Sequence, residues 1–448
     1  MASGPKRKFG LSKARTTRVR TAPAASVRVA SPWLSFDLDF VGCPRVPVAL
    51  ASILRGWDLT TGPVRPASRD KIEFRWSGRK LLWHSATKPV PKSWIDLPPA
   101  TVFDAVCDIH YEMSDWFLAE RPGHLGLHAA AIEFGKGLVV FPSTIKAGKS
   151  VLTIAAAAAG LRIFGDDVLA VHPKTHDGVA LGMLPRLRLP LPASLSSSFH
   201  AFLAARRGNS NKRHHYVDLK DHELAPLGTT APIAGFVLLD RKENGRATLG
   251  SVSHGEMLKC AISRNFASDV LGAAEIFSKA EKLTAKAGRF RLTYADCDDA
   301  IEHLAGKFGW PKSAAPLSKR SPALRRPSRD SKSAEPGRKR AAPVPENTLA
   351  HAQDTDSEKP LVQSPRIKLR RMGADNFLID PESDAIHHLN ELGAAVWQLF
   401  AVARRPAETV ALVQAAFPGV PETKIRSDLE HLIAGMLHSG VLRARRRR

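Results

Sequence analysis

The segment Phe141-Pro-Ser-Thr-Ile-Lys-Ala-Gly-Lys-Ser-Val-Leu152 decides how the long N-terminal part of this chain is interpreted. It follows the apolar run Leu138–Phe141 and opens an alanine-rich stretch, Val151–Ala159, which predicts the order strand, tight loop, Lys-Ser and helix. In such a loop, backbone amides and a helix N-terminus attract an anion. The lysine adds a positive charge, and the serine hydroxyl is a ligand for Mg²⁺. The segment therefore predicts a phosphate-binding loop.

The match to the full phosphate-loop pattern is partial. The pattern has a glycine five residues before its second glycine, and Ser143 stands at that position. Ser143 and Lys146 both replace loop glycines, so any of these positions that needs a positive φ carries a penalty of about 1–2 kcal/mol. Two interpretations stay open: an enzyme with a rebuilt loop, and a protein that binds nucleotide without transferring phosphate.

A pair of carboxylates follows the predicted helix. The second apolar strand, Leu161–Val171, is interrupted by Asp166 and Asp167. Two carboxylates at a strand end suit a nucleotide site, where one holds Mg²⁺ and the other accepts a hydroxyl proton. An isolated Gly-Asp-Asp is more often a turn. Because this pair comes one strand after a Lys-Ser helix, we favour the phosphate site.

The stretch from His128 to Asp167 resembles HPr kinase/phosphorylase, the bacterial protein-serine kinase with a P-loop inside a fold akin to PEP carboxykinase. That family has a histidine on the strand before the loop, the Lys-Ser of the loop, and an Asp-Asp pair after the next helix. The residues at these positions are His128, Lys149, Ser150, Asp166 and Asp167. The wider chain, about 31 to 310, resembles the HPr-kinase-related offshoot often found beside peptide-modifying systems.

The resemblance implies an ATP- and Mg²⁺-dependent kinase and assigns its residues. Lys149 contacts the β- and γ-phosphates, Ser150 ligates Mg²⁺ and Asp166 assists the metal. Asp167 is the base for a substrate hydroxyl, and His128 lies close to the transferring group. The implied nucleotide-binding residues are Ser143, Thr144, Ile145, Lys146, Ala147, Gly148, Lys149, Ser150 and Val151.

One departure from the family concerns the second metal carboxylate. Where the family supplies that acid, the segment Met183–Pro190 contains none. Arg186 and Arg188 of this segment are candidates for a phosphate contact instead. The change keeps a degenerate pseudokinase open as an alternative to an active kinase.

A second domain is predicted near the C-terminus. Residues 311–362 are rich in Pro, Ser, Ala and basic residues and predict a linker. Arg366–Leu369 and Phe377–Asp380 then predict a short hairpin, followed by helical patterns that end at Gly440–Leu442. The segment 363–443 resembles the PqqD-like peptide chaperones, small winged-helix modules that hold precursor peptides for modifying enzymes. The resemblance implies that a leader peptide binds by strand addition to the hairpin edge.

The net charge of +23 over 448 residues lies mostly in three segments. Residues 1–30 hold eight Lys/Arg and no acid, residues 312–345 hold ten against two acids, and the last seven residues hold five Arg. The rest is nearly neutral, which argues against a basic docking face for nucleic acid. The tails still predict weak, salt-dependent contact with nucleic acid or other polyanions.

The cysteines and the apolar runs exclude other classes. The four cysteines form no CxxC or Cys/His cluster, so we expect neither a zinc site nor a disulfide framework. The chain lacks an apolar run of about 18 residues, so we expect no membrane span, and we expect a cytoplasmic protein. A homo-oligomer, as in the resembled kinases, is a further expectation.

We therefore predict an α/β protein with a P-loop core like HPr kinase and PEP carboxykinase, and a small C-terminal winged-helix domain. The predicted parts are a basic tail (1–30), a kinase domain (31–310), a linker (311–362), a PqqD-like domain (363–443) and a second basic tail (444–448). The predicted function is ATP-dependent phosphorylation of a Ser/Thr hydroxyl on a peptide or small protein that the PqqD-like module recruits. The alternatives are a nucleotide-binding regulator or peptide chaperone without catalysis, and a DNA-associated winged-helix protein.

Overall fold

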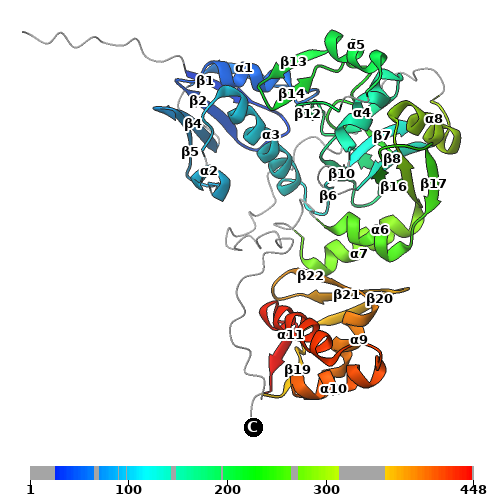
Figure 1. Cartoon of the computed structure of the whole chain (residues 1–448). Coiled ribbons are helices and arrows are strands. Elements are labelled where there is room, and N and C mark those ends of the chain that lie inside the picture. The colour runs from blue at the N-terminus through cyan, green and yellow to red at the C-terminus, as the bar shows by residue number, and fades with distance from the viewer. Residues whose placement is uncertain are drawn as a thin grey trace, which may run out of the picture.

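The computed structural model describes residues 26–64, 70–88, 90–96, 98–142, 148–192, 195–263, 271–311 and 359–445. The predicted tail up to residue 25, the loop residues Ser143, Thr144, Ile145, Lys146 and Ala147, and residues 312–358 of the predicted linker lie outside the described residues. Within the described parts the chain has a mixed α/β architecture with several sheets (Figure 1).

The N-terminal unit is built on a five-stranded sheet of order β3-β1-β2-β4-β5. Its strands are β1 (Ser26–Ala30), β2 (Asp37–Val41), β3 (Thr60–Pro63), β4 (Lys71–Ser77) and β5 (Lys80–Ser85), and its helices are α1 (Arg45–Ser52), α2 (Lys92–Asp96) and α3 (Val102–Ala119). Strands β4 and β5 form an antiparallel hairpin, and α3 is the longest helix of this unit. Strand β2 begins only at Asp37, because the preceding residues turn while Trp33 and Phe36 stay buried.

Aromatic packing joins this sheet to α3. Trp83 of β5 lies 5.5 Å from Trp116 of α3 between ring centroids, and Phe40 stacks on Phe74 at 5.1 Å. The helix starts where the Thr101 side chain accepts a hydrogen bond from the amide of Asp104, which satisfies one of the free N-terminal amides. Helix α3 is thereby fixed against the sheet and extends toward the central domain (Figure 1).

The central domain contains a six-stranded mixed sheet of order β17-β18-β16-β8-β7-β9. Its strands are β7 (Ala130–Phe134), β8 (Gly137–Phe141), β9 (Arg162–Gly165), β16 (Ile233–Arg241), β17 (Thr248–Ser251) and β18 (Gly288–Tyr294). Strands β8, β16 and β18 run parallel to one another. The predicted strand Leu138–Phe141 is confirmed as part of β8.

Helices cover both faces of this sheet. Val139 of β8 packs in the same core cluster as α4 (Lys149–Ala158) and α8 (Cys297–Phe308). Its neighbour Val140 faces the other way, toward α6 (His254–Ile262) and α7 (Ala273–Lys286). Alternation along buried strands therefore produces two apolar cores, one on each side.

Two small sheets complete the central domain. One has the order β15-β11-β10-β6 and the other the order β12-β14-β13. Their elements are β6 (Leu125–Leu127), β10 (Leu169–Val171), β11 (Gly178–Val179), β15 (Thr230–Ala231), β12 (Arg186–Arg188), β13 (Arg207–Ser210) and β14 (His214–Val217), with α5 (Ser197–Ala205) beside the second sheet. Strands β9 and β10 belong to different sheets, so the chain crosses between sheets at Asp166–Val168.

The C-terminal module has a three-stranded antiparallel sheet of order β20-β21-β22 and a separate two-stranded pair, β19-β23. Its elements are β19 (Leu361–Gln363), β20 (Lys368–Met372), β21 (Asp375–Asp380), β22 (Ala385–Leu389), α9 (Glu391–Leu399), α10 (Pro406–Ala416), α11 (Glu422–His438) and β23 (Leu442–Ala444). The predicted hairpin is present as β20-β21. Strand β19 begins inside the predicted linker, two residues before the predicted domain boundary, and it pairs with β23 because Leu361 and Leu442 are both buried in the module's core.

Candidate functional site

Gly148 is the N-cap residue directly before helix α4, and it has a left-handed backbone with φ of 91°. A Cβ at this position would lie 2.8 Å from the hydroxyl of Tyr294, so only glycine fits without displacement. Tyr294 ends β18 and is 1 % exposed, and its hydroxyl is buried without a hydrogen-bond partner in the described structure. The end of the predicted phosphate loop is therefore a close-packed helix start that faces an unsatisfied phenol.

Lys149 and Ser150 occupy the first turn of α4, as predicted. Lys149 is buried, while Ser150 and Val151 are half-buried. The hydroxyl of Ser150 hydrogen-bonds to Asp166, and the charge of Lys149 also acts on that carboxylate. The Lys-Ser turn and the first acid of the Asp-Asp pair therefore meet in space, although 15 residues lie between Ser150 and Asp166 in the sequence.

Asp166 is 6 % exposed, and burial is the main reason that its pKa rises to about 7. The charge of Asp167 raises the pKa further, whereas hydrogen bonds from Ser150 and from the amide of Arg186 lower it. The Oδ1 atom of Asp166 is buried without a hydrogen-bond partner in the described structure. A buried carboxylate oxygen without a donor is suited to binding a cation.

Asp167 is held from a different part of the chain. The hydroxyl of Tyr111, on α3, lies 3.4 Å from Oδ2 of Asp167 and donates to it. Arg186 donates to the same Tyr111 oxygen at 3.0 Å, and its guanidinium lies 5.4 Å from the centroid of the Tyr111 ring. The N-terminal unit thus supplies a side chain to the carboxylate pair.

A small enclosed pocket adjoins these groups. Asp166, Asp167, Arg186 and His110 line it together with apolar residues of the central domain. Burial is the main cause that lowers the pKa of His110 to about 4, and the charge of Arg186 adds to this effect. His110 is therefore neutral at pH 7, and its Nδ1 lies 3.0 Å from the hydroxyl of Tyr216.

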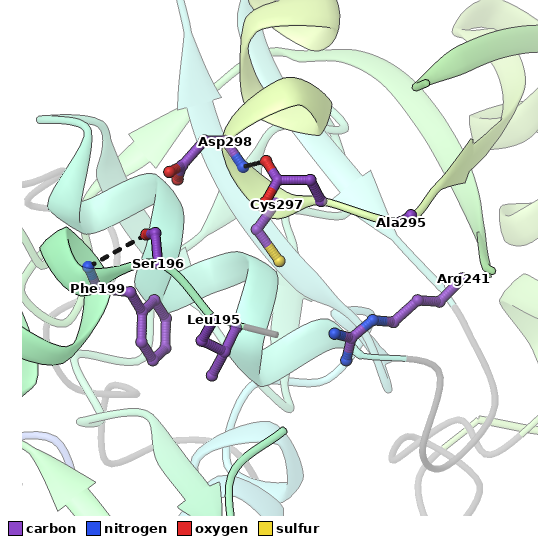
Figure 2. Close-up of a pocket in the computed structure, with 8 residues that line it drawn as sticks. Leu195, Ser196, Phe199, Arg241, Ala295, Cys297 and Asp298 are labelled. Carbon is purple, nitrogen blue, oxygen red and sulfur yellow. Dashed lines mark hydrogen bonds between the residues drawn. The ribbon is translucent and has the colours of Figure 1, made fainter. Parts of the chain in front are cut away.

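A second small pocket lies near the start of α4 (Figure 2). Arg241, at the end of β16, points into it between Leu195 and Cys297 (Figure 2). Ser196 caps α5 here by accepting from the amide of Phe199. Arg241 also lies near Gly148, with its Cδ 3.7 Å from the position of a Cβ on that glycine. A guanidinium and the starts of α5 and α8 thus lie near Gly148 and the start of α4.

Two further predicted residues, His128 and Arg188, do not line the two pockets described above. His128 is half-buried in the short break between β6 and β7, so it is not on β8, the strand directly before the loop. Nor does it line the pocket around Asp166 and Asp167. Arg188 is exposed on β12. The predicted Arg186 contact with phosphate stays a prediction, and the structure places that arginine against Tyr111 and Asp166.

No group of three or more His, Cys, Asp or Glu residues able to hold a metal occurs in the described ranges. Ser150 and Asp166 nevertheless fit the Mg²⁺ that the resemblance implies, because a hydroxyl and an unsatisfied buried carboxylate oxygen are both oxygen ligands. Mg²⁺ commonly takes only one or two protein carboxylates and completes its shell with water and phosphate oxygens.

The edges of the module's sheet differ in charge. Strand β20 exposes Lys368, Arg370 and Arg371, and positive side chains on an edge strand discourage further pairing. Strand β22 contains no Lys, Arg, Asp or Glu. Among the described residues it pairs only with β21. The edge of β22 is therefore the less protected one.

Comparison with known proteins identifies the C-terminal module. Residues 376–442 match the family model of coenzyme PQQ synthesis protein D (PqqD). Among solved structures, TbiB1 in complex with the TbiA(beta) leader peptide is similar at 17 % identity, over 19 % of this chain and 99 % of that chain, with a TM-score of 0.18. A score this low carries no argument about the whole chain.

No curated protein matches the chain. In the described part of the chain, every helix is too short or too polar to cross a membrane. Residues 376–442, which fall inside the segment 363–443 predicted from the sequence, form a PqqD-like domain.

Proposed function

We propose that the N-terminal and central parts form an ATP-dependent kinase that phosphorylates a serine or threonine hydroxyl of a peptide or small protein. The PqqD-like module would bind that peptide. The observation that carries the proposal is the meeting of Lys149 and Ser150, at the start of α4, with Asp166 and its neighbour Asp167. A helix N-terminus, a cation, a metal-binding hydroxyl and two carboxylates are the groups that phosphoryl transfer from a nucleotide requires.

The roles follow from the geometry. Lys149 and the amides at the start of α4 would bind the phosphates, and Ser150 with Asp166 would hold Mg²⁺. When bound, Mg²⁺ neutralises charge on the phosphate oxygens. Asp167 would accept the proton of the substrate hydroxyl while that oxygen bonds to the γ-phosphorus and the bond from phosphorus to the β-phosphate oxygen breaks, which releases ADP. Tyr111 would orient Asp167 through its hydrogen bond.

The peptide-binding half of the proposal rests on the family match and on the open edge of β22. An extended peptide that adds to an edge strand gains main-chain hydrogen bonds, while side chains on alternate positions provide selectivity. The module would thus recruit a peptide within a peptide-modifying system and present it to the kinase. Because the segment Met183–Pro190 contains no acid where the resembled family has a second metal carboxylate, a nucleotide-binding regulator without transfer is the second candidate.

Phosphate transfer from γ-labelled ATP tests the kinase. The purified full chain would be incubated with Mg²⁺ and with the short peptides encoded next to its own gene. We expect labelled peptide with the wild type and at least about 100-fold less with Asp167→Asn, because a general base contributes about 10²–10⁴-fold. ATP binding should survive Asp167→Asn and weaken in Lys149→Ala. Tight Mg-ATP binding without transfer, unchanged in Asp167→Asn, would establish the regulator instead.

A further inference from the structure

The central strand of the C-terminal module is buried on both faces. Leu378 of β21 belongs to the module's own core with α9 and α11, and its exposed fraction is 0 %. Phe377 and Ile379 point the other way and are 0 % and 4 % exposed. They join the core cluster of the central domain instead of facing solvent. A strand in a sheet with helices on one face only normally alternates apolar and polar residues. Phe377, Leu378 and Ile379 are consecutive apolar residues, so this strand requires a covering layer on each face.

That second layer is made by α6 and α7 of the central domain, which lie directly over the sheet (Figure 1). Phe277 of α7 meets Phe377 with ring centroids 5.4 Å apart in an edge-to-face arrangement, a favoured geometry for aromatic pairs. Ile386 of β22 packs against the same cluster. The contact is therefore apolar at its centre and uses side chains from both partners.

Two carboxylates of the module close the ends of this contact. Asp384, in the turn before β22, accepts from the amide of Ala273, the first residue of α7, at 3.2 Å. Asp375, the first residue of β21, packs beside the start of α6. Its Oδ2 is 3.4 Å from the hydroxyl of Ser253, the N-cap residue of that helix. Each helix start thus receives a negative charge, which the helix dipole favours.

The fit at the start of α6 leaves no spare room. A Cβ added to Gly255 would overlap the side chain of Asp375, including its Cβ, so that side chain packs directly against the backbone of α6. Asp375 is held in turn by His388, whose Nε2 lies 2.7 Å from Oδ1, and the His388 ring packs 5.3 Å from that of Phe377. The contact therefore combines an apolar centre, two helix caps and a glycine-dependent approach.

We propose that α6 and α7 form a dedicated docking platform for the PqqD-like module of the same chain, so that the module works at a fixed position on the central domain. A module that moved freely at the end of the linker predicted for residues 311–362 would instead gain only from a raised local concentration. With both sheet faces covered, a peptide reaches the sheet only along a strand edge. The edge of β22 then runs beside α7, so that the central domain borders the bound peptide.

Hydrogen–deuterium exchange of the full chain tests the platform without any ligand. In Gly255→Ala the new methyl group displaces Asp375, although alanine favours the helix itself. We expect at least tenfold faster exchange at the start of α7, where the Ala273 amide loses Asp384, with unchanged protection of α9 and α11. Gly306→Ala is the matched control, because that helical glycine has no neighbouring atom within 4 Å of an added Cβ.

A second variant approaches the contact from the module. Phe377→Asp places a charge against Phe277 and should release the same α7 amides, whereas Phe417→Asp, at a residue that is 46 % exposed, should not. Loss of protection in α9 and α11 would show that Phe377→Asp unfolds the module. In that case the test of the platform rests on the exchange measured for Gly255→Ala. If the amides at the start of α7 exchange at the same rate in Gly255→Ala as in the wild type, the proposal is overturned.

Discussion

Tyr111 and Asp167 are 56 residues apart in the sequence, yet the tyrosine hydroxyl donates to the aspartate carboxylate at 3.4 Å. The contact joins α3 of the N-terminal unit to the crossing between the two sheets of the central domain. It also connects Asp167 to Arg186, because the arginine donates to the same phenol oxygen. The N-terminal unit is therefore a part of the candidate site and not only a neighbour of it.

Tyr111→Phe tests whether this contact positions the proposed base. Phenylalanine keeps the aromatic ring beside Arg186 and removes only the hydroxyl. We expect kcat to fall about 10- to 150-fold, the equivalent of roughly 1.5–3 kcal/mol for a hydrogen bond to a charged group, with the KM for ATP unchanged. Steady-state kinetics of peptide phosphorylation measures both constants. A rise in KM with constant kcat would assign Tyr111 to binding and not to orientation.

Gly148→Ala should weaken ATP binding for two separable reasons. The left-handed backbone costs about 1–2 kcal/mol with a side chain, and the new methyl group meets the hydroxyl of Tyr294. Adding Tyr294→Phe removes the second cause and leaves the first. Calorimetric titration of ATP into both variants should therefore show partial recovery in the double variant. Equal affinities for the single variant and the wild type would show that the start of α4 does not bind the phosphates.

Acid should destabilise the protein through His124. Burial is the main cause that lowers its pKa to about 4, and its Nε2 is buried without a hydrogen-bond partner in the described structure. The unfolded chain takes up this proton near pH 6.5 and the folded chain only near pH 4, so this contribution to stability is present at pH 7 and is lost as the pH falls through that window.

His124→Gln removes this titration. Between pH 7 and pH 4 the wild type should lose up to about 3 kcal/mol more of its free energy of unfolding than the variant loses. Urea unfolding at several pH values provides the comparison. Parallel pH profiles for the two proteins would mean that His124 does not enter the folded core as a neutral ring.

A buried acid should hold the module's sheet together. Asp380 ends β21 with an exposed fraction of 0 %, and it accepts from Arg366 at 3.0 Å and from the Ser383 hydroxyl at 2.7 Å. Asp380→Ala removes the buried acceptor of the half-buried Arg366 and of the Ser383 hydroxyl, and should destabilise the module by about 1.5–3 kcal/mol. Glu382→Ala is the control, because that side chain is 69 % exposed. Loss of protection against hydrogen exchange in α11 reports the effect.

Local patterns predicted much of this molecule. The Lys-Ser turn after an apolar strand located the start of α4, because it depends on residues adjacent in sequence. Leu161–Val171 was predicted as one interrupted strand, whereas the structure has two strands in different sheets with the Asp-Asp pair between them. The match of residues 376–442 to PqqD was likewise anticipated by the hairpin and helical patterns of that segment. The kinase chemistry assigned to these positions stays a prediction.

Two features had no local signal. Tyr111 is one polar residue on an amphipathic helix, and nothing in its neighbourhood indicates that it meets a carboxylate of another unit. The platform on α6 and α7 was missed for the same reason, because Phe377 and Phe277 are 100 residues apart. The apolar run Phe377-Leu-Ile was interpreted as a hairpin strand, whereas its lack of polar alternation marks burial on both faces.

The two-sided burial of β21 has a practical consequence for anyone who wishes to transplant the C-terminal module. When it is separated from the central domain, the module would expose Phe377 and Ile379 to solvent. Exposed apolar patches of this kind promote self-association. Fusing the module to another enzyme therefore requires either an equivalent pair of helices in that enzyme or the substitution of these apolar residues by polar ones.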